Sequence, residues 1–210
     1  MYQPSDEILK RYADVLIKFA PHNGQGMQPW ERVCIRIHES AKPFLKYLQM
    51  AVIEAGAFLY IDYIPEGIDK DFFSHASDAQ ISDVPRNIAL WKVADSDYLL
   101  VIESSEDKHE LDGVDPQKMM LSLKARKFVA DARNEKEAQW KFDWCIALYG
   151  TPSMAAEAGL SLEEYWQEII YACFLDKENP IEKWKEVATD IDLIKAKLTD
   201  LKIQSVHMQW

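Results

Sequence analysis

Apolar residues follow two different spacings along the chain, and the spacing predicts where strands and helices lie. Four segments alternate or run apolar as strands do: residues 32–37, 58–64, 98–103 and 142–148. Segments with apolar residues three and four positions apart separate them, which is typical of helices. Strands joined by helices and short connections form parallel crossover units. The pattern therefore predicts a three-layer α/β fold with a mostly parallel, Rossmann-like sheet.

The last third of the chain is predicted to be helical. A capping box at residues 161–164 begins one helix, and Asn179-Pro180 begins a final long helix. We predict that an apolar stripe of this last helix faces the core. The stripe consists of Ile181, Trp184, Val187, Ala188, Ile191, Ile194 and Leu198.

The last residues of the chain carry a strand pattern of their own. Over residues 203–210, Val206, Met208 and Trp210 alternate with polar side chains. A strand needs a sheet partner, so we expect this segment to pair with another chain, lie on an edge or be mobile. We therefore divide the chain into an α/β domain over residues 1–200 and a separate strand over residues 201–210.

Composition narrows the classes of function. The chain has 35 acidic and 24 basic side chains, a formal charge of −11, which argues against nucleic acid as a partner. Apolar runs stay well short of the roughly 18 residues of a membrane span, and the amino terminus lacks the features of a signal peptide. Cys34, Cys145 and Cys173 are widely spaced in apolar segments, so we interpret them as buried free thiols. These observations predict a cytoplasmic protein without a membrane partner.

Motifs that would identify a self-contained active site are missing. The five histidines have no metal-ligand spacing, and the sequence contains neither a Cys-x-x-Cys pair nor a nucleophile elbow. The turn after the first predicted strand has no glycine and carries Glu39, which argues against a dinucleotide phosphate at that position. We therefore assign no catalytic and no metal-binding residue.

Carboxylates gather at the ends of the predicted strands. They are Glu39, Glu66, Glu103, Glu106 and Asp107. Two interpretations are open: a crevice above the sheet that binds a cation or an amine, or a solvated rim in a protein already rich in acidic side chains. The composition favours the rim.

Two longer segments resemble a known family. Residues 111–118 read Leu-Asp-Gly-Val-Asp-Pro-Gln-Lys, and residues 149–155 read Tyr-Gly-Thr-Pro-Ser-Met-Ala before Glu-Ala-Gly-Leu-Ser-Leu-Glu-Glu-Tyr at 157–165. Both are similar to segments of the metallo-aminopeptidases of the aminopeptidase T, aminopeptidase S and PepS type, with weaker support at residues 12–14 and 54–57. The resemblance runs in order along nearly the whole chain. It departs at Gly150, where proline is common, and at residues 103–110, which are unusually acidic.

This resemblance implies a leucyl-type aminopeptidase that removes N-terminal residues from peptide substrates. The family is cytoplasmic and homodimeric, and two divalent cations (zinc, cobalt or magnesium) activate a water molecule. Its Glu, His and Asp ligands belong to a C-terminal catalytic domain, and no position of this chain matches one. Residues 201–210 resemble the strand that leads into that domain, which is missing from the sequence. We therefore expect this chain to bind no catalytic cation, to be inactive alone, and to wall the active-site chamber.

The resemblance also suggests where the missing domain would make contact. We predict that the interdomain or chamber-facing residues are Tyr149, Gly150, Thr151, Pro152 and Trp210, because the crevice of an open α/β sheet lies beyond the carboxyl ends of its strands. The alternative interpretation of the first four residues is that they only form the start of a helix at Pro152. A stand-alone α/β binding or interaction module without catalysis is the alternative for the whole chain.

Overall fold

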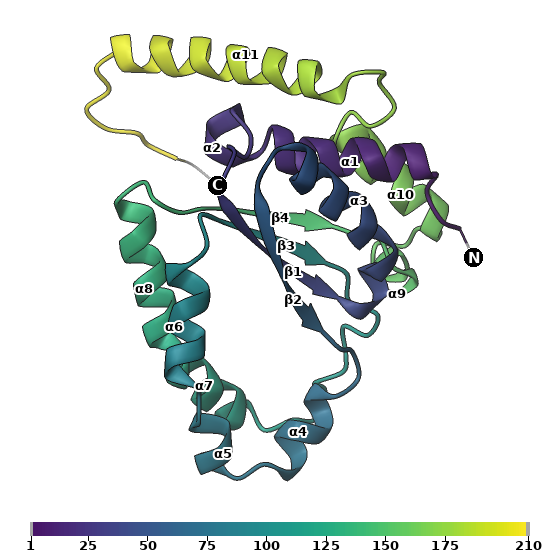
Figure 1. Ribbon diagram of the computed structural model, residues 1–210, viewed down its shortest axis with the longest axis vertical. Helices are drawn as coiled ribbons and strands as arrows, with labels where there is room; N and C mark the ends of the chain where they lie inside the picture. Colours follow the sequence, from purple (N-terminus) through teal and green to yellow (C-terminus); the bar gives the residue numbers. More distant parts are fainter. Residues whose placement is uncertain (1, 209–210) are drawn as a thin grey trace.

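A computed structural model describes residues 2–208 and contains one parallel sheet (Figure 1). The strands are β1 (Arg32–His38), β2 (Phe58–Ile64), β3 (Tyr98–Glu103) and β4 (Asp143–Leu148), in the spatial order β2-β1-β3-β4. Each neighbouring pair is parallel. The predicted strands are confirmed, with ends that differ by no more than one residue, and so is the three-layer α/β fold.

Helices connect the strands and cover the sheet. They are α1 (Asp6–Lys18), α2 (Pro21–Gly24), α3 (Lys42–Glu54), α4 (Asp69–His75), α5 (Asp78–Ser82), α6 (Arg86–Ala94), α7 (Pro116–Ala125), α8 (Lys127–Ala138), α9 (Pro152–Glu157), α10 (Leu162–Ala172) and α11 (Pro180–Asp200), with a 3-10 turn η1 (Glu39–Ala41) before α3. Side chains of Ser5, Thr151, Ser161 and Asn179 accept hydrogen bonds from the first turns of α1, α9, α10 and α11. The predicted capping box at Ser161 is present.

The main core lies on one face of the sheet, under α1, α3 and α10. Ile35 on β1 and Leu100 on β3 are fully buried there, and Tyr12 of α1 stacks on Phe44 of α3 with ring centroids 5.2 Å apart. β-branched and leucine side chains of the two central strands suit this position because they fill a dry interior from a pleated surface. Burial of this face is the main contribution to the stability of the fold.

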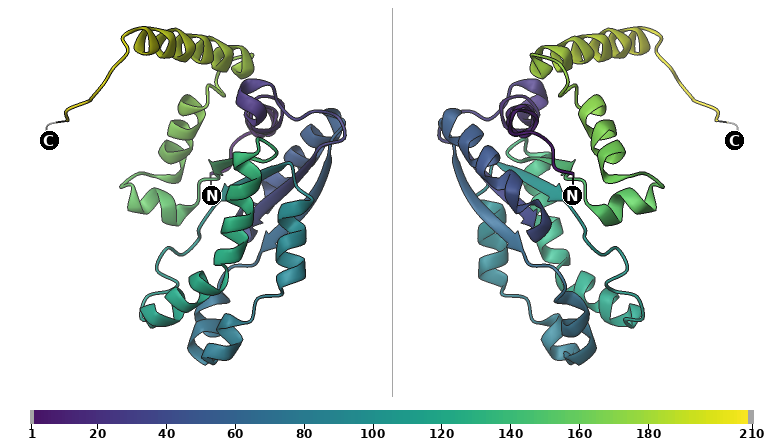
Figure 2. Two further views of the ribbon diagram at one scale, coloured as in Figure 1. Left: turned by 90° about the vertical axis from the view of Figure 1, so that its left-hand side faces the viewer. Right: turned by 90° about the vertical axis from the view of Figure 1, so that its right-hand side faces the viewer.

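The opposite face of the sheet has a much smaller core. Cys34, Leu99 and Phe142 form a separate buried cluster there. On the edge strand β4, the large residues Trp144 and Ile146 point toward this face and are 49% and 57% exposed. Helices α6 and α8 stand on this side of the molecule but leave β4 largely uncovered (Figures 1 and 2).

The prediction for the apolar stripe of α11 is wrong over most of its length. Ile181 and Trp184 pack against the main core, but Ile191, Ile194 and Leu198 are 57%, 58% and 51% exposed. Figures 1 and 2 show α11 along the outside of the molecule, with its C-terminal half extending past α1 and α2. Helical periodicity correctly identified an apolar face, but no other element of the described chain covers it.

Residues 203–208 form no strand. Val206 and Met208 are 73% and 71% exposed, and the segment runs away from α11 without a sheet neighbour (Figure 2). The alternating pattern alone cannot make a strand, because each ladder needs a partner for its backbone groups. The last two residues, including Trp210, lie outside the described part. The division at residue 200 and the link to a further domain therefore stay predictions.

Candidate functional site

The strand order places a crevice at the carboxyl ends of β1 and β3. From β1 the chain crosses to β2 on one side, and it later returns to form β3 on the other side. Open α/β sheets bind ligands at such a switch point, because the loops diverge there. In this protein the loops after β1, β2 and β3 surround a cavity of about 660 Å³. Its lining residues are His38, Glu39, Ser40, Glu66, Gly67, Ser105, Glu106, Asp107 and Glu110.

Hydrogen bonds hold the three loops of this crevice together. The Ser40 hydroxyl lies 2.7 Å from Oε1 of Glu66 and 2.8 Å from the hydroxyl of Ser104, which is fully buried. The backbone N–H of Asp69 donates to Oε1 of Glu110 over 2.9 Å. Ser40 is therefore engaged by a carboxylate and a second serine, which is the bonding of a structural tie between loops and not of an activated nucleophile.

The crevice collects most of the carboxylates that the sequence analysis had singled out. Glu39, Glu66, Glu106 and Asp107 line it, and Glu110, which sequence analysis missed, joins them. Glu103 does not, because it lies within β3, where its carbonyl accepts the N–H of Tyr149. Side chains of one sign around a concave surface favour a ligand group of the opposite charge. The chemistry of the crevice suits an ammonium or guanidinium group better than a phosphate.

These carboxylates do not assemble a metal centre. Within residues 2–208, no group of three or more His, Cys, Asp or Glu side chains is placed to hold a metal ion. A two-cation hydrolase site needs several convergent ligands around ions about 3.5–4 Å apart. The pair of cations implied by the resemblance therefore does not fit this part of the protein.

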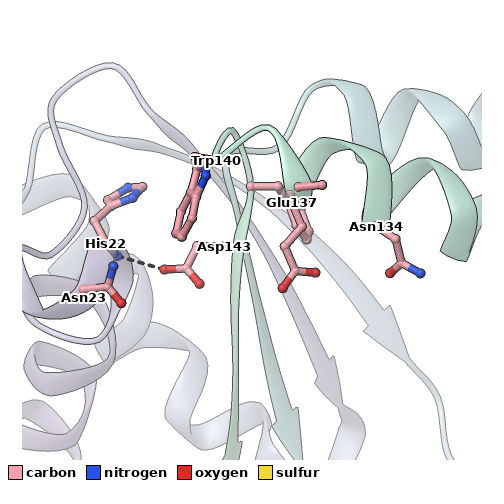
Figure 3. A pocket seen from close by; sticks show the side chains of 8 residues that line it. His22, Asn23, Asn134, Glu137, Trp140 and Asp143 are labelled. Atoms are coloured by element: carbon pink, nitrogen blue, oxygen red, sulfur yellow. Dashed lines mark hydrogen bonds between the residues drawn. The ribbon is translucent and has the colours of Figure 1, made fainter. Parts of the chain in front are cut away.

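A second cavity, of about 530 Å³, lies near the amino ends of the strands (Figure 3). Asp143 accepts the backbone N–H groups of His22 and Trp144, each over 2.8 Å, and the Trp144 indole donates to Glu137 over 3.2 Å. Figure 3 shows the carboxylates of Asp143 and Glu137 on either side of a space beneath Trp140. Neutral N–H donors thus hold both carboxylates in place.

The four residues predicted to touch another domain have roles inside this chain. Tyr149 is buried between Phe44, at a centroid distance of 6.1 Å, and Trp166, which it meets edge-on at 5.0 Å. The Thr151 hydroxyl caps α9 and donates to the carbonyl of Ser105. Pro152 begins α9 and is the exposed member of the four. These contacts explain the segment as packing, and its contact with a further domain stays a prediction.

Packing also explains why glycine occupies position 150, where the resembling family often has proline. A Cβ atom at Gly150 would lie 2.9 Å from Cδ1 of Tyr165 and 3.0 Å from Nε1 of Trp166. The Trp166 indole donates to the carbonyl of Gly150 over 3.1 Å, so the ring cannot move away without losing a buried hydrogen bond. The close approach of α10 is thus the cause of this departure from the family pattern.

The cysteines are not activated nucleophiles. All three are free thiols, with Cys34 buried and Cys145 and Cys173 half-buried. Burial raises the pKa of each thiol above its ordinary value, which lowers the fraction of reactive thiolate at neutral pH. The prediction of free thiols is confirmed, but the prediction that all three are buried is correct only for Cys34.

Comparison with known proteins identifies relatives of one kind. Residues 5–210 match the family described as thermophilic metalloprotease (M29). Aminopeptidase PepS of Streptococcus thermophilus is 24% identical over 218 residues, covering 96% of this chain and 50% of PepS. Aminopeptidase 2 of Geobacillus stearothermophilus is 22% identical over 188 residues, covering 85% of this chain and 44% of that protein. The chain thus spans about half the length of the curated relatives it matches.

A solved structure supports the fold independently. Wild-type AmpT from Thermus thermophilus superposes with a TM-score of 0.68 at 18% identity, over 85% of this chain and 45% of AmpT. At this identity the likeness shows the fold alone. In the described part of the chain, no helix combines the length and apolar character needed to cross a membrane.

Proposed function

This chain belongs to the M29 family of thermophilic metalloproteases, and we propose that it is the N-terminal α/β half of a leucyl-type aminopeptidase. The observation that carries the proposal is the match of residues 5–210 to the family, combined with a coverage of about half of each aminopeptidase relative. In this proposal the chemistry belongs to a C-terminal catalytic half, and the present chain forms one wall of the active-site chamber.

The crevice at the carboxyl ends of the strands supports a role as a chamber wall. It lies where open α/β sheets receive ligands, and its lining includes Glu66, Asp107 and Glu110. The substrate of an aminopeptidase carries a free α-ammonium group, and a surface rich in carboxylates attracts such a cation through its long-range field. The crevice thus offers favourable electrostatics for peptide entry, without supplying a catalytic group.

In the proposed enzyme, two divalent cations (zinc, cobalt or magnesium) would polarise the scissile peptide bond and activate a water molecule. Their ligands would come from the C-terminal half. Peptides would be the substrates, the C-terminal half the partner of this chain, and the cytoplasm its location. The alternative to this proposal is a stand-alone α/β binding or interaction module without catalysis. This alternative is compatible with the exposed apolar face of α11.

The proposal is tested first at the gene. We expect the reading frame to continue past the codon for Trp210 into a segment of similar length that contains Glu, His and Asp. The long product and the 210-residue chain are then purified in parallel, stripped of metal, and assayed with leucyl-p-nitroanilide and added zinc, cobalt or magnesium. Metal-dependent turnover by the long product, with none by the 210-residue chain, is the expected result.

Two outcomes would contradict this division of labour. A stop codon directly after Trp210 would favour the stand-alone module. Metal-dependent turnover by the 210-residue chain, persisting through successive purification steps in constant ratio to the protein, would place the ligands within residues 1–210. Calorimetry with zinc alone provides a second measurement, since the proposal predicts no stoichiometric binding of a cation pair by the short chain.

A further inference from the structure

A tryptophan occupies an unusual backbone position beside the cavity at the amino ends of the strands. Trp140 follows the end of α8 in the left-handed conformation, with a φ of 58°. Its N–H donates to the carbonyl of Glu137 over 2.8 Å, and the N–H of Lys141 donates to the carbonyl of Lys136 over 3.2 Å. This pair of bonds is the Schellman ending of a helix, in which glycine is the usual residue because a Cβ atom is costly there. The backbone alone would therefore favour glycine at position 140.

Packing within the chain does not explain this tryptophan. Trp140 is 90% exposed, whereas Trp166 is 1% exposed and donates its indole N–H to a buried carbonyl. Across the cavity, His22 and Asn23 also adopt the left-handed conformation, each with a φ of 56°. Three of the six non-glycine residues with positive φ within residues 2–208 thus line this one cavity. Strained backbone of this kind concentrates at binding sites, where the position of a side chain matters more than its cost.

Two carboxylates without a cationic partner face the same cavity. Glu137 and Asp143 are held by the N–H donors described above, and Figure 3 shows both beside the space beneath Trp140. The ion pairs found within residues 2–208 include neither of them. Lys136 directs its ammonium group to three backbone carbonyls, and Nε2 of His22 lies 3.0 Å from a carboxylate oxygen of Glu31. The cavity therefore combines an exposed aromatic ring with acceptors that suit a cation.

We propose that this cavity binds a guanidinium group on an alkyl chain, as in an arginine side chain. A guanidinium plane stacks on an indole ring and, at its edge, donates several N–H groups to carboxylates. Trp140 supplies the ring, and Glu137 and Asp143 supply the acceptors. The volume of about 530 Å³ is that of a site for a small ligand or a single side chain. The site lies at the opposite end of the sheet from the acidic crevice, and the proposal does not depend on peptidase activity.

The test is a titration of the isotope-labelled 210-residue chain, followed by the NMR signal of the Trp140 indole N–H. The probe is N-acetylarginine amide, which carries the guanidinium group as its only charge. We expect a dissociation constant on the order of 1 mM, as for a single stacked cation with charge-assisted hydrogen bonds. N-acetylcitrulline amide, which is similar in shape but neutral, should bind at least about tenfold more weakly. Added salt should weaken binding of the arginine probe only.

Replacement of the ring tests the aromatic part of the site without endangering the fold. Trp140→Gly should weaken binding at least about fivefold, read from the backbone N–H of Asp143, because the stacked surface is lost. Its thermal unfolding midpoint should stay unchanged or rise, since glycine suits a left-handed position. Trp30→Gly is the matched control: Trp30 is 81% exposed with a φ of 75° but does not line the cavity. It should leave the dissociation constant unchanged.

Replacement of a carboxylate tests the charged part of the site. Glu137→Gln keeps an oxygen that can accept the Trp144 indole N–H but removes the charge. It should weaken binding of the arginine probe about threefold to tenfold and leave the citrulline probe unaffected. Glu135→Gln is its control, because Glu135 is an exposed residue of the same helix that does not line the cavity. It should bind the arginine probe as the unchanged chain does.

A guanidinium group could come from a peptide side chain or from a small free molecule, and two further probes distinguish these sources. One is the blocked tripeptide acetyl-Gly-Arg-Gly-amide, and the other is agmatine. Tighter binding of the tripeptide would identify a peptide as the source, because backbone groups would then add contacts. Tighter binding of agmatine would identify a small amine.

Three results would overturn the proposal. The first is the absence of any shift at a concentration of the arginine probe about twenty times the expected dissociation constant. The second is equal binding of the arginine and citrulline probes, since the site would then not recognise a cation. The third is a Trp140→Gly variant that binds the arginine probe as well as Trp30→Gly does, because the exposed ring would then have no part in the site.

Discussion

The helices α1 and α11 both carry apolar residues at helical spacing, but the structure buries them to very different extents. Each begins at a capping side chain, Ser5 or Asn179, and each carries apolar residues three and four positions apart. On α1 the apolar face is buried except for the partly exposed Ile8, whereas on α11 only the first turns are covered. The buried residues of α1 are Leu9, Tyr12, Ala13, Val15, Leu16 and Ile17.

The difference arises from what lies beneath each helix. α1 packs along α3 over the main core. Hydrogen bonds also hold its middle and its C-terminal end: Arg11 donates to the carbonyl of Leu175, and the carbonyl of Ile17 accepts the N–H of Met27. α11 touches α1 and α2 near its start and then extends beyond them. Periodicity therefore shows that a face is made for burial, but not whether the same chain, another domain or another copy buries it.

The largest expected difference between the two helices is in the loss of stability when an apolar side chain is shortened to alanine. Leu9→Ala should lower the free energy of unfolding by about 2–5 kcal/mol, because Leu9 is 1% exposed and its loss leaves a cavity. Ile191→Ala should change it by less than about 0.5 kcal/mol, as an exposed site that gains helix propensity. Urea unfolding at a concentration where the chain is monomeric measures both. Equal losses would show that α11 is covered within the chain, contrary to this structure.

Substitutions that enlarge a side chain should also affect stability differently in the two regions, by a smaller amount than the truncations. Gly150→Ala should cost about 1–3 kcal/mol, because its new methyl group would overlap Tyr165 and Trp166 in the core that α1 covers. Ala196→Leu, on the exposed side of α11, should be neutral to within about 0.5 kcal/mol. Thermal unfolding of both variants checks the pair. A neutral Gly150→Ala would mean that α10 can shift away from the sheet without loss.

The smallest effect concerns pH and the tie between α1 and α3. Burial alone would lower the pKa of Lys18, but its contacts with Asp14 and Glu54, each 2.6 Å away, outweigh burial and raise it. The hydrogen bond from Lys18 in turn lowers the pKa of Glu54. A lysine whose pKa is raised on folding contributes stability at pH values below its pKa in the unfolded state. This contribution is lost as the pH rises through its pKa in the folded state. A glutamate whose pKa is lowered on folding contributes stability at pH values above its pKa in the unfolded state. This contribution is lost as the pH falls through its pKa in the folded state.

The tie therefore stabilises the protein between the two titrations, from above about pH 4.3 to below about pH 10.4. Lys18→Met should lower stability within that window and flatten its dependence on pH at both ends. Lys185→Met is the control, because Lys185 pairs with Glu182 inside α11 and joins no second element. Unfolding titrations from acid to alkaline pH measure the difference, and identical profiles for the two variants would show that the tie contributes nothing.

The sequence alone determined the regular elements and the family. Strand spacing placed β1 to β4 to within one residue, because two-residue alternation and uninterrupted apolar runs are local properties of a sheet. The capping box at Ser161 and the Asn179-Pro180 start were readable for the same reason, since a cap involves neighbours three residues away. The segments at residues 111–118 and 149–165 were enough to indicate the family that the comparison confirmed.

Only the tertiary structure decided which residues meet. Glu66 and Glu110 line one cavity because the loops after β2 and β3 end at the same edge of a parallel sheet, a fact of strand order and not of spacing. Gly150 is required by the ring of Trp166, sixteen residues away. The exposure of the apolar face of α11 could not be predicted from the sequence either. Helical spacing shows that a face is apolar, but whether it is buried depends on every element that folds around it.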